Sequence, residues 1–154
     1  MKERVYKLIK KLQYKKRNLR ALAQIMHMQT GEDFQTLTKV LNELEKEMKI
    51  YRDKRGYYHD IMNQHYEVGE LDLKHQGYGF LVLDDKPDIF IPQSKTLSAM
   101  NGDLCLVEIT RRKSSLKIEG KVVKVVERKI KRVIGEYVNG QVFPKGYPDD
   151  LIFE

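Results

Sequence analysis

Two short runs in the middle of the chain place aromatic side chains where they could stack on unpaired bases. Tyr78 and Phe80 alternate with Gly77 and Gly79, and Phe90 lies in a second apolar run further on. Alternate residues of a strand share a face, and Phe90 can join the other rings if the two runs pair as a hairpin. A face of exposed rings is suited to single-stranded nucleic acid. The glycines would leave room for a nucleic-acid strand close to the backbone.

The alternative for these rings is an ordinary place in a protein core. Leu81 and Leu83 fall on the opposite face of the same strand and can fill the core instead. We therefore expect Tyr78, Phe80 and Phe90 to be exposed for stacking.

Polar residues that could contact phosphate or base lie beside these runs. Lys74 and His75 directly precede the first run. Arg111, Arg112 and Lys113 are expected in the loop after the fourth strand, next to the binding face of a small barrel. In both places the alternative is a solvated surface turn.

Other chemistries have weaker support. Asp84, Asp85 and Asp88 could attract Mg²⁺, but a hairpin turn already explains aspartates there. The four histidines are scattered and, with one cysteine, form no zinc pattern. Cys105 lies in an apolar run and is expected to be a core residue rather than a nucleophile. No phosphate-binding or dinucleotide-binding glycine loop is present in the sequence. We therefore expect no catalytic site, metal site or cofactor in these residues.

Positive charge is concentrated in two blocks. The chain has 154 residues and a net charge of +7, with +8 in residues 1–20, −5 in residues 67–110 and +8 in residues 111–132. Basic blocks attract phosphates, although a solvated helix face is the alternative. No apolar run is long enough for a membrane span, and the single cysteine excludes an internal disulfide framework. These features indicate a monomeric cytoplasmic protein that does not contact membranes.

The first part of the chain has helical periodicity. Apolar residues recur at helical spacing in three segments within residues 1–48, with Asn18 as a plausible N-cap of the second segment. Two short strands around a turn at residues 53–56 are expected to follow. Three helices and a small β-ribbon are typical of a winged helix, which we assign to residues 1–62.

The contacts of such a domain would not come from its third helix. That helix carries several acidic residues, so we do not expect it to enter a nucleic-acid groove. The better candidates for duplex contacts are basic residues of the first helical region and the wing: Lys15, Lys16, Arg17, Lys54 and Arg55.

The second part of the chain has strand periodicity. Five strands are expected within residues 67–130, at 68–74, 78–83, 88–91, 103–109 and 117–126. Five short strands suit an OB-fold barrel, so the predicted fold class is α+β. Residues 131–154 are expected to begin a truncated second barrel or to form a β-tail.

The motifs resemble those of a known family. Gln76-Gly77-Tyr78-Gly79-Phe80-Leu81 and Ile89-Phe90-Ile91-Pro92 resemble the two nucleic-acid-binding motifs of cold-shock domains. Asn101-Gly102-Asp103 resembles the turn before the fourth strand of that domain, and Arg132-Val133-Ile134-Gly135-Glu136-Tyr137 looks like the lead into a second one. Together with the helical half, this order resembles the N-terminal region of bacterial ribonuclease R.

The resemblance implies a function. Ribonuclease R is a processive, magnesium-dependent 3′-to-5′ exoribonuclease, and its catalytic domain with clustered aspartates lies C-terminal to such barrels. The chain would then bind RNA and help to deliver or unwind it, with ribosomal or degradation-machinery proteins as further partners. Gln76 and Pro92 replace a basic residue and a histidine of the cold-shock pattern, which should weaken binding by the barrel alone.

Two other functions remain open from the sequence. The chain could be a free-standing winged-helix and OB regulator of transcription or translation, which predicts preference for one duplex sequence. It could also be a protein-docking module that uses the acidic third helix and the apolar residues 151–153.

Overall fold

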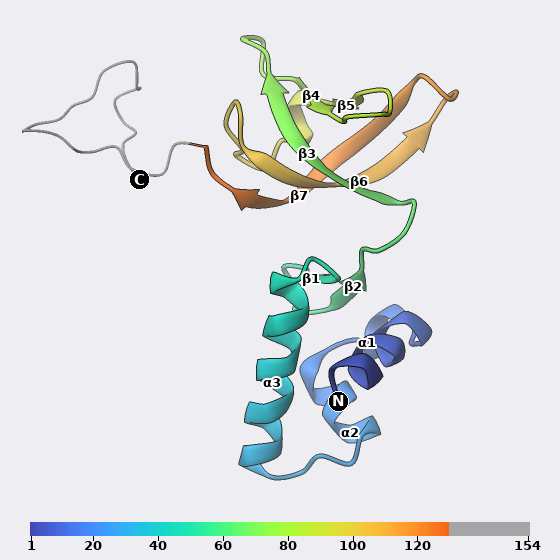
Figure 1. Ribbon diagram of the computed structural model, residues 1–154, viewed down its shortest axis with the longest axis vertical. Coiled ribbons are helices and arrows are strands. Elements are labelled where there is room, and N and C mark those ends of the chain that lie inside the picture. Colours follow the sequence, from blue (N-terminus) through green and yellow to red (C-terminus); the bar gives the residue numbers. More distant parts are fainter. Residues whose placement is uncertain (130–154) are drawn as a thin grey trace, which may run out of the picture. The chain divides into compact units, whose positions relative to one another are not determined.

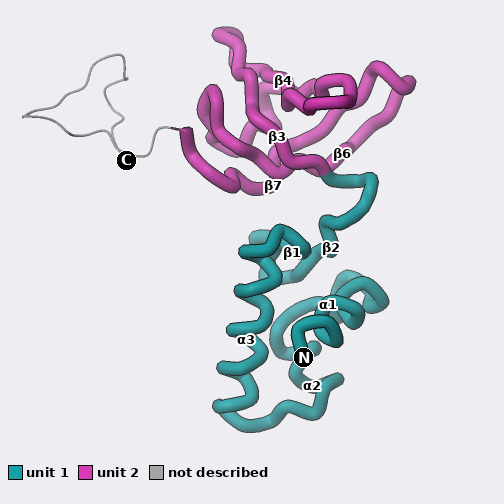
Figure 2. The backbone as a smooth tube through the Cα atoms, viewed as in Figure 1, with its two compact units in different colours: residues 1–66 teal, residues 67–154 magenta. Residues whose placement is uncertain are grey.

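The chain divides into two compact units. A computed structural model describes residues 1–129, and residues 130–154, where a further barrel or tail is expected, lie outside the described residues. Unit 1 comprises residues 1–66 and unit 2 begins at residue 67 (Figure 2). Within residues 1–129, no helix is long and apolar enough to span a bilayer.

Unit 1 begins with three α-helices, as the periodicity predicted (Figure 1). They are α1 (Lys2–Lys11), α2 (Leu19–Ile25) and α3 (Gly31–Lys46), with a short 3₁₀ helix, η1 (Tyr14–Lys16), after α1. The starts of α2 and α3 are set by capping side chains. Asn18 accepts a hydrogen bond from the Ala21 amide at 2.8 Å, and Thr30 forms a capping box with Asp33.

A two-stranded ribbon, the wing, completes unit 1. Strands β1 (Ile50–Arg52) and β2 (Tyr58–Asp60) pair antiparallel, and β2 starts one residue later than expected. All three helices and the ribbon contribute to one buried apolar core. Its members are Val5, Ile9, Leu22, Ala23, Met26, Leu37, Leu41, Leu44, Ile50 and Tyr58. Removal of this apolar area from water is the main force holding the helices on the ribbon.

The described part of unit 2 forms a closed five-stranded barrel, which confirms the α+β fold class and the OB-like architecture. Its strands are β3 (Tyr66–Leu73), β4 (Gly79–Val82), β5 (Ile89–Ile91), β6 (Leu104–Arg112) and β7 (Ile118–Glu127), with the 3₁₀ helix η2 (Gln93–Lys95) after β5. The spatial order is β3-β4-β5-β7-β6, and β5 pairs with β7 in parallel (Figure 1). A long β6–β7 hairpin therefore closes the barrel against the short β4–β5 hairpin.

The barrel interior follows the alternation of the strands. Leu71, Leu81, Ile89 and Ile91 are almost fully buried, together with apolar residues of β6 and β7. Each such side chain stabilises the fold by ~1.5–3 kcal/mol on burial. Because Leu81 points inward, its neighbours Phe80 and Val82 must point outward.

The Asn101-Gly102-Asp103 turn holds the barrel ends together. Gly102 has a φ of +89°, a conformation that favours glycine. Asp103 is 1% exposed and accepts hydrogen bonds from the Met100 amide at 2.8 Å and the Lys129 amide at 3.1 Å. Its carboxylate also pairs with Arg128 at 3.2 Å. The turn therefore ties the start of β6 to the residues that follow β7.

Candidate nucleic-acid interface

The aromatic residues form one cluster on the outer face of β4 and β5. Phe80 and Phe90 are direct partners across the two strands, with ring centroids 5.7 Å apart. The Tyr78 ring lies 6.0 Å from Phe80 and 5.8 Å from Phe90. Phe90 is 37% exposed, whereas Tyr78 and Phe80 are half-buried. Tyr78 meets Phe80 edge-on, the other two ring pairs are tilted, and the cluster leaves surface available for a flat ligand.

The glycines beside these rings serve the fold, contrary to the expectation that they make room for a nucleic-acid strand. Gly79 is buried, and a Cβ there would lie 2.9 Å from the carbonyl oxygen of Asp72 on β3. Gly77 has a φ of +101°, and its Cβ would lie 2.9 Å from the Gln93 side chain. Gly79 therefore permits close packing of β3 and β4, and Gly77 permits the turn.

Lys74 lies at one edge of the ring cluster. Its Nζ is 6.0 Å from the centre of the Phe80 ring and 3.1 Å from a carboxylate oxygen of Asp72. The exposed ion pair holds the ammonium loosely, because such pairs contribute ~0–1 kcal/mol. His75 is exposed in the same turn, which is closed by the Gly77 amide donating to the Lys74 carbonyl at 2.9 Å.

The expected basic loop after the fourth strand is shorter than the sequence indicated. Strand β6 extends through Arg112, so Arg111 and Arg112 belong to the strand and only Lys113 begins the loop. Arg111 stands opposite Glu119, and irregular register near Ile109 lets the hairpin continue. All three basic residues are exposed, as their proposed role requires.

A small pocket adjoins the rings and was missed by sequence reasoning. It measures about 270 Å³ and lies where β5 meets β7 and the β6–β7 loop. Its lining residues are Phe80, Asp88, Phe90, Lys113, Leu116, Lys117, Ile118 and Glu119. The parallel pairing of β5 with β7 brings Glu119 beside Phe90. No local motif marks Lys117 or Glu119. Only the strand order of OB barrels, in which β5 lies beside β7, could have predicted the place of these residues next to Phe90.

Unit 1 brings two separate basic segments together. Helix η1, with Lys15 and Lys16, contacts the wing because the Tyr14 hydroxyl donates to Asp53 Oδ2 at 2.7 Å. The Tyr58 amide donates to the Arg17 carbonyl at 2.8 Å. The wing residues Lys54 and Arg55 are exposed in the turn that Asp53 begins, and Lys15 and Lys16 are exposed as well. All five proposed duplex contacts therefore come from two segments that are joined by hydrogen bonds.

Asp53 is the centre of this junction. It accepts hydrogen bonds from His59 at 2.9 Å, from Tyr14, and from the amides of Arg55 and Tyr57. Desolvation opposes ionisation of Asp53, but the hydrogen bonds outweigh it and lower its pKa to about 2. The Asp53 carboxylate is therefore occupied by hydrogen bonds within the junction. The nearby cations Lys54 and Arg55 are exposed to solvent.

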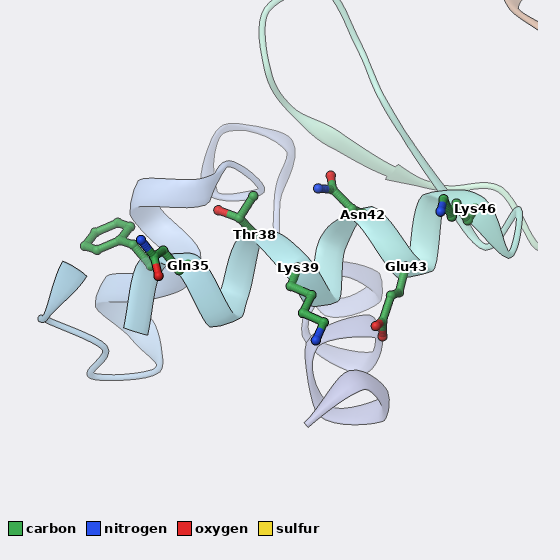
Figure 3. A pocket seen from close by; sticks show the side chains of 7 residues that line it. Gln35, Thr38, Lys39, Asn42, Glu43 and Lys46 are labelled. Atoms are coloured by element: carbon green, nitrogen blue, oxygen red, sulfur yellow. The ribbon is translucent and has the colours of Figure 1, made fainter. Parts of the chain in front are cut away.

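The outward face of α3 has a pocket of about 520 Å³ that is lined mostly by polar side chains (Figure 3). Gln35, Thr38, Lys39, Asn42, Glu43 and Lys46 line it together with Phe34. Some acidic residues of this region are engaged elsewhere, because Lys2 pairs with Glu47 at 2.6 Å and with Glu43 at 3.6 Å. Asp33 belongs to the helix cap.

Cys105 is fully buried in the barrel, and burial raises the pKa of its thiol to about 11. Within residues 1–129, no group of His, Cys, Asp or Glu side chains could hold a metal ion.

Comparisons with known proteins agree with this geometry. A family model described as the ribonuclease B OB domain matches residues 69–125, the part of the chain that forms the barrel. Ribonuclease R of Thermotoga maritima is 36% identical over 138 residues, covering 89% of this chain and 19% of the relative. The chain resembles the N-terminal region of bacterial ribonuclease R. Ribonuclease R of Aquifex aeolicus is 30% identical over 139 residues, and ribonuclease R 1 of Lactococcus lactis is 27% identical over 124 residues.

The matches to ribonuclease R extend over both units. The Thermotoga and Aquifex relatives each cover 89% of this chain, well beyond the barrel itself. The chain spans about a fifth of the length of these two relatives, 19% in each case. The similarity supports a nucleic-acid-binding region of a ribonuclease R-like protein.

Proposed function

We propose that this chain is the RNA-binding N-terminal region of a ribonuclease R-like 3′-to-5′ exoribonuclease. The observation that carries the proposal is the outward cluster of Tyr78, Phe80 and Phe90 on an OB barrel of the ribonuclease B type. Single-stranded RNA would lie across β4 and β5 with its bases on these rings.

The ring geometry supports stacking by more than one base. The centroids are 5.7–6.0 Å apart and the ring planes are inclined, so the rings offer separate surfaces rather than one continuous plane. Stacking on aromatic side chains is worth ~1–3 kcal/mol per base and tolerates any base. This mode suits an enzyme that degrades RNA of many sequences.

Phosphate contacts would come from cations around the rings. Lys74 lies at one edge of the cluster, next to His75, and Lys113 lines the pocket at the other. Arg111 and Arg112 project from the end of β6. Glu70, Asp72 and Asp88 surround the same face, so the barrel gains less from charge than from stacking.

Structured RNA would contact unit 1 at the junction of η1 and the wing. Lys15, Lys16, Arg17, Lys54 and Arg55 provide the charge, and the Asp53 hydrogen bonds hold the two segments together. This surface would help to position or open duplex RNA before the single strand reaches the barrel.

Catalysis is assigned to a domain outside the described residues. The Mg²⁺ expected for a ribonuclease R-like enzyme would be bound there, by the clustered aspartates that the resemblance implies. The protein would act in the cytoplasm as a monomer, and the outward face of α3 is the surface we assign to ribosomal or degradative protein partners.

The stacking mechanism can be tested by fluorescence titration of the 154-residue chain with labelled single-stranded RNA at several salt concentrations. The double variant Tyr78→Ala, Phe80→Ala should lose at least roughly tenfold in affinity, because two stacking surfaces are removed. Val82→Ala is a matched control, since Val82 is a 43% exposed residue on the outward face of β4 outside the ring cluster. Absence of RNA binding, or equal binding by the double variant and the control, would refute the proposal.

A further inference from the structure

The pocket beside Phe90 combines features that a general stacking surface does not need. It has two ring walls, Phe80 and Phe90, and an aliphatic wall formed by Leu116 and Ile118. Leu116 is 74% exposed, so its side chain is accessible to a ligand. The volume of about 270 Å³ lies just below the usual range for small-molecule sites, as suits one flat ring.

Two acidic residues line this pocket. Glu119 is half-buried on β7 and is the parallel strand partner of Phe90, so the two side chains start about 4.8 Å apart across the ladder. Its backbone carbonyl accepts from the Thr110 hydroxyl at 3.2 Å. Within residues 1–129, the carboxylate itself takes part in no ion pair or hydrogen bond. Asp88, the second carboxylate, is exposed at the pocket rim.

Carboxylates at this place conflict with a purely phosphate-binding role. An ionised carboxylate repels phosphate and can only accept hydrogen bonds. The edge of a base offers the matching donors, because cytosine, adenine and guanine carry an exocyclic amino group and uracil does not. In uracil, the single ring N–H lies between two carbonyl oxygens. A carboxylate that approaches this N–H is repelled by both oxygens.

We propose that this pocket reads the edge of a base stacked on Phe90, with Glu119 accepting a hydrogen bond from its exocyclic amino group. Acceptance of a cytosine amino group by Glu or Asp is a known mode of base recognition. Lys113 and Lys117 supply the complementary donors for a ring nitrogen or carbonyl next to that amino group. The site therefore favours amino-bearing bases over uracil at one position of the bound strand.

This inference rests on the proposed RNA binding. A comparison of two pyrimidine oligomers distinguishes a failure of base recognition from a failure of RNA binding itself. Labelled oligocytidine and oligouridine of equal length are titrated with the 154-residue chain. The two bases have similar size, so the comparison isolates the edge that Glu119 would contact. The wild-type chain should bind oligocytidine roughly five- to tenfold more tightly. Binding to neither oligomer would refute the proposed function, whereas equal binding to both would leave that function standing and overturn the base-reading site.

Glu119→Gln tests the residue directly. Its side chain keeps the shape but can donate to uracil as well as accept from cytosine, so the ratio of the two affinities should approach one. Glu108→Gln is the control with the same charge change, because Glu108 lies on the neighbouring strand, pairs with Lys121 at 3.8 Å and does not line the pocket. Thermal melts establish that both variants fold. A folded Glu119→Gln variant that keeps the wild-type ratio would overturn the assignment, as would a Glu108→Gln variant that loses it.

Discussion

The two units prepare different kinds of contact with nucleic acid. In unit 1, the Asp53 carboxylate is occupied by hydrogen bonds, and the neighbouring Lys15, Lys16, Lys54 and Arg55 are exposed. In unit 2, the rings form the exposed cluster, and the acidic residues Glu119 and Asp88 lie next to it. The proposed contacts of unit 1 therefore come from cations alone, whereas in unit 2 rings, carboxylates and the cations Lys113 and Lys117 lie together.

The two kinds of contact respond differently to salt. Contacts to phosphate release counterions and weaken steeply with salt, whereas stacking on rings depends little on it. A chain with both surfaces can hold RNA electrostatically at one place and read or guide its bases at another. The predictions below test how independent the two surfaces are.

The largest effect is expected from Asp103→Ala, which should destabilise the barrel. The substitution leaves the amides of Met100 and Lys129 without their acceptor and removes the partner of Arg128. The expected cost is ~2–4 kcal/mol in the free energy of unfolding. Hydrogen exchange should show loss of protection in β3, β6 and β7 and little change in α1, α2 and α3. The conservative Asp103→Asn variant should lose less free energy of unfolding. Equal loss of hydrogen-exchange protection in both units would contradict the division of the chain into two separate units.

Asp53→Asn should loosen the junction in unit 1 by a smaller amount. An amide cannot accept all the hydrogen bonds that the carboxylate accepts from Tyr14, His59 and the backbone, and the expected cost is ~1–2 kcal/mol. Binding of hairpin RNA should weaken along with stability, while binding of a short single strand should be preserved. Asp84→Asn, an exposed substitution in the turn after β4, is the control. Equal weakening of the binding of hairpin RNA and of the single strand would show that the junction is not a separate binding surface for structured RNA.

The contrast between the units also explains what the sequence could predict. Local signals sufficed where one element decides the outcome: Asn18 caps α2, and the alternation around Leu81 places Phe80 outside. They failed where distant segments meet. The place of Glu119 beside Phe90 depends on a parallel strand pair, and the place of Arg111 in β6 depends on irregular register in a long hairpin.

The glycines show the same limit. Gly77 and Gly79 precede the two aromatic residues, and a ligand-based role was the natural hypothesis. The atoms that require their small size belong to β3 and η2, namely the Asp72 carbonyl and the Gln93 side chain. Such contacts follow from tertiary packing, so no local pattern distinguishes them from an approach by nucleic acid.

A smaller effect is expected for salt dependence. The double variant Lys16→Gln, Lys54→Gln should reduce the slope of log affinity against log salt by up to about 1.8 for duplex RNA, since each lost phosphate contact contributes about 0.9. The ring variant Tyr78→Ala, Phe80→Ala should lower affinity and leave the slope unchanged.

The control for this experiment is Lys39→Gln, Lys46→Gln, which makes the same charge change on the outward face of α3. A larger change in slope for the α3 pair than for the junction pair would move the duplex contact to α3. That outcome would favour groove binding by the helix over phosphate binding at the wing.

The smallest effect concerns acid stability of unit 1. The pKa of Asp53 is lowered from 3.8 to about 2, so its ionised form is favoured by folding. The resulting stabilisation is fully present above about pH 4 and is lost as the pH falls toward 2. Chemical unfolding followed by circular dichroism at several pH values should show a shallower acid loss for Asp53→Asn than for the wild type. Parallel acid profiles for the two chains would mean that other carboxylates govern the acid response, and that the junction does not depend on the charge of Asp53.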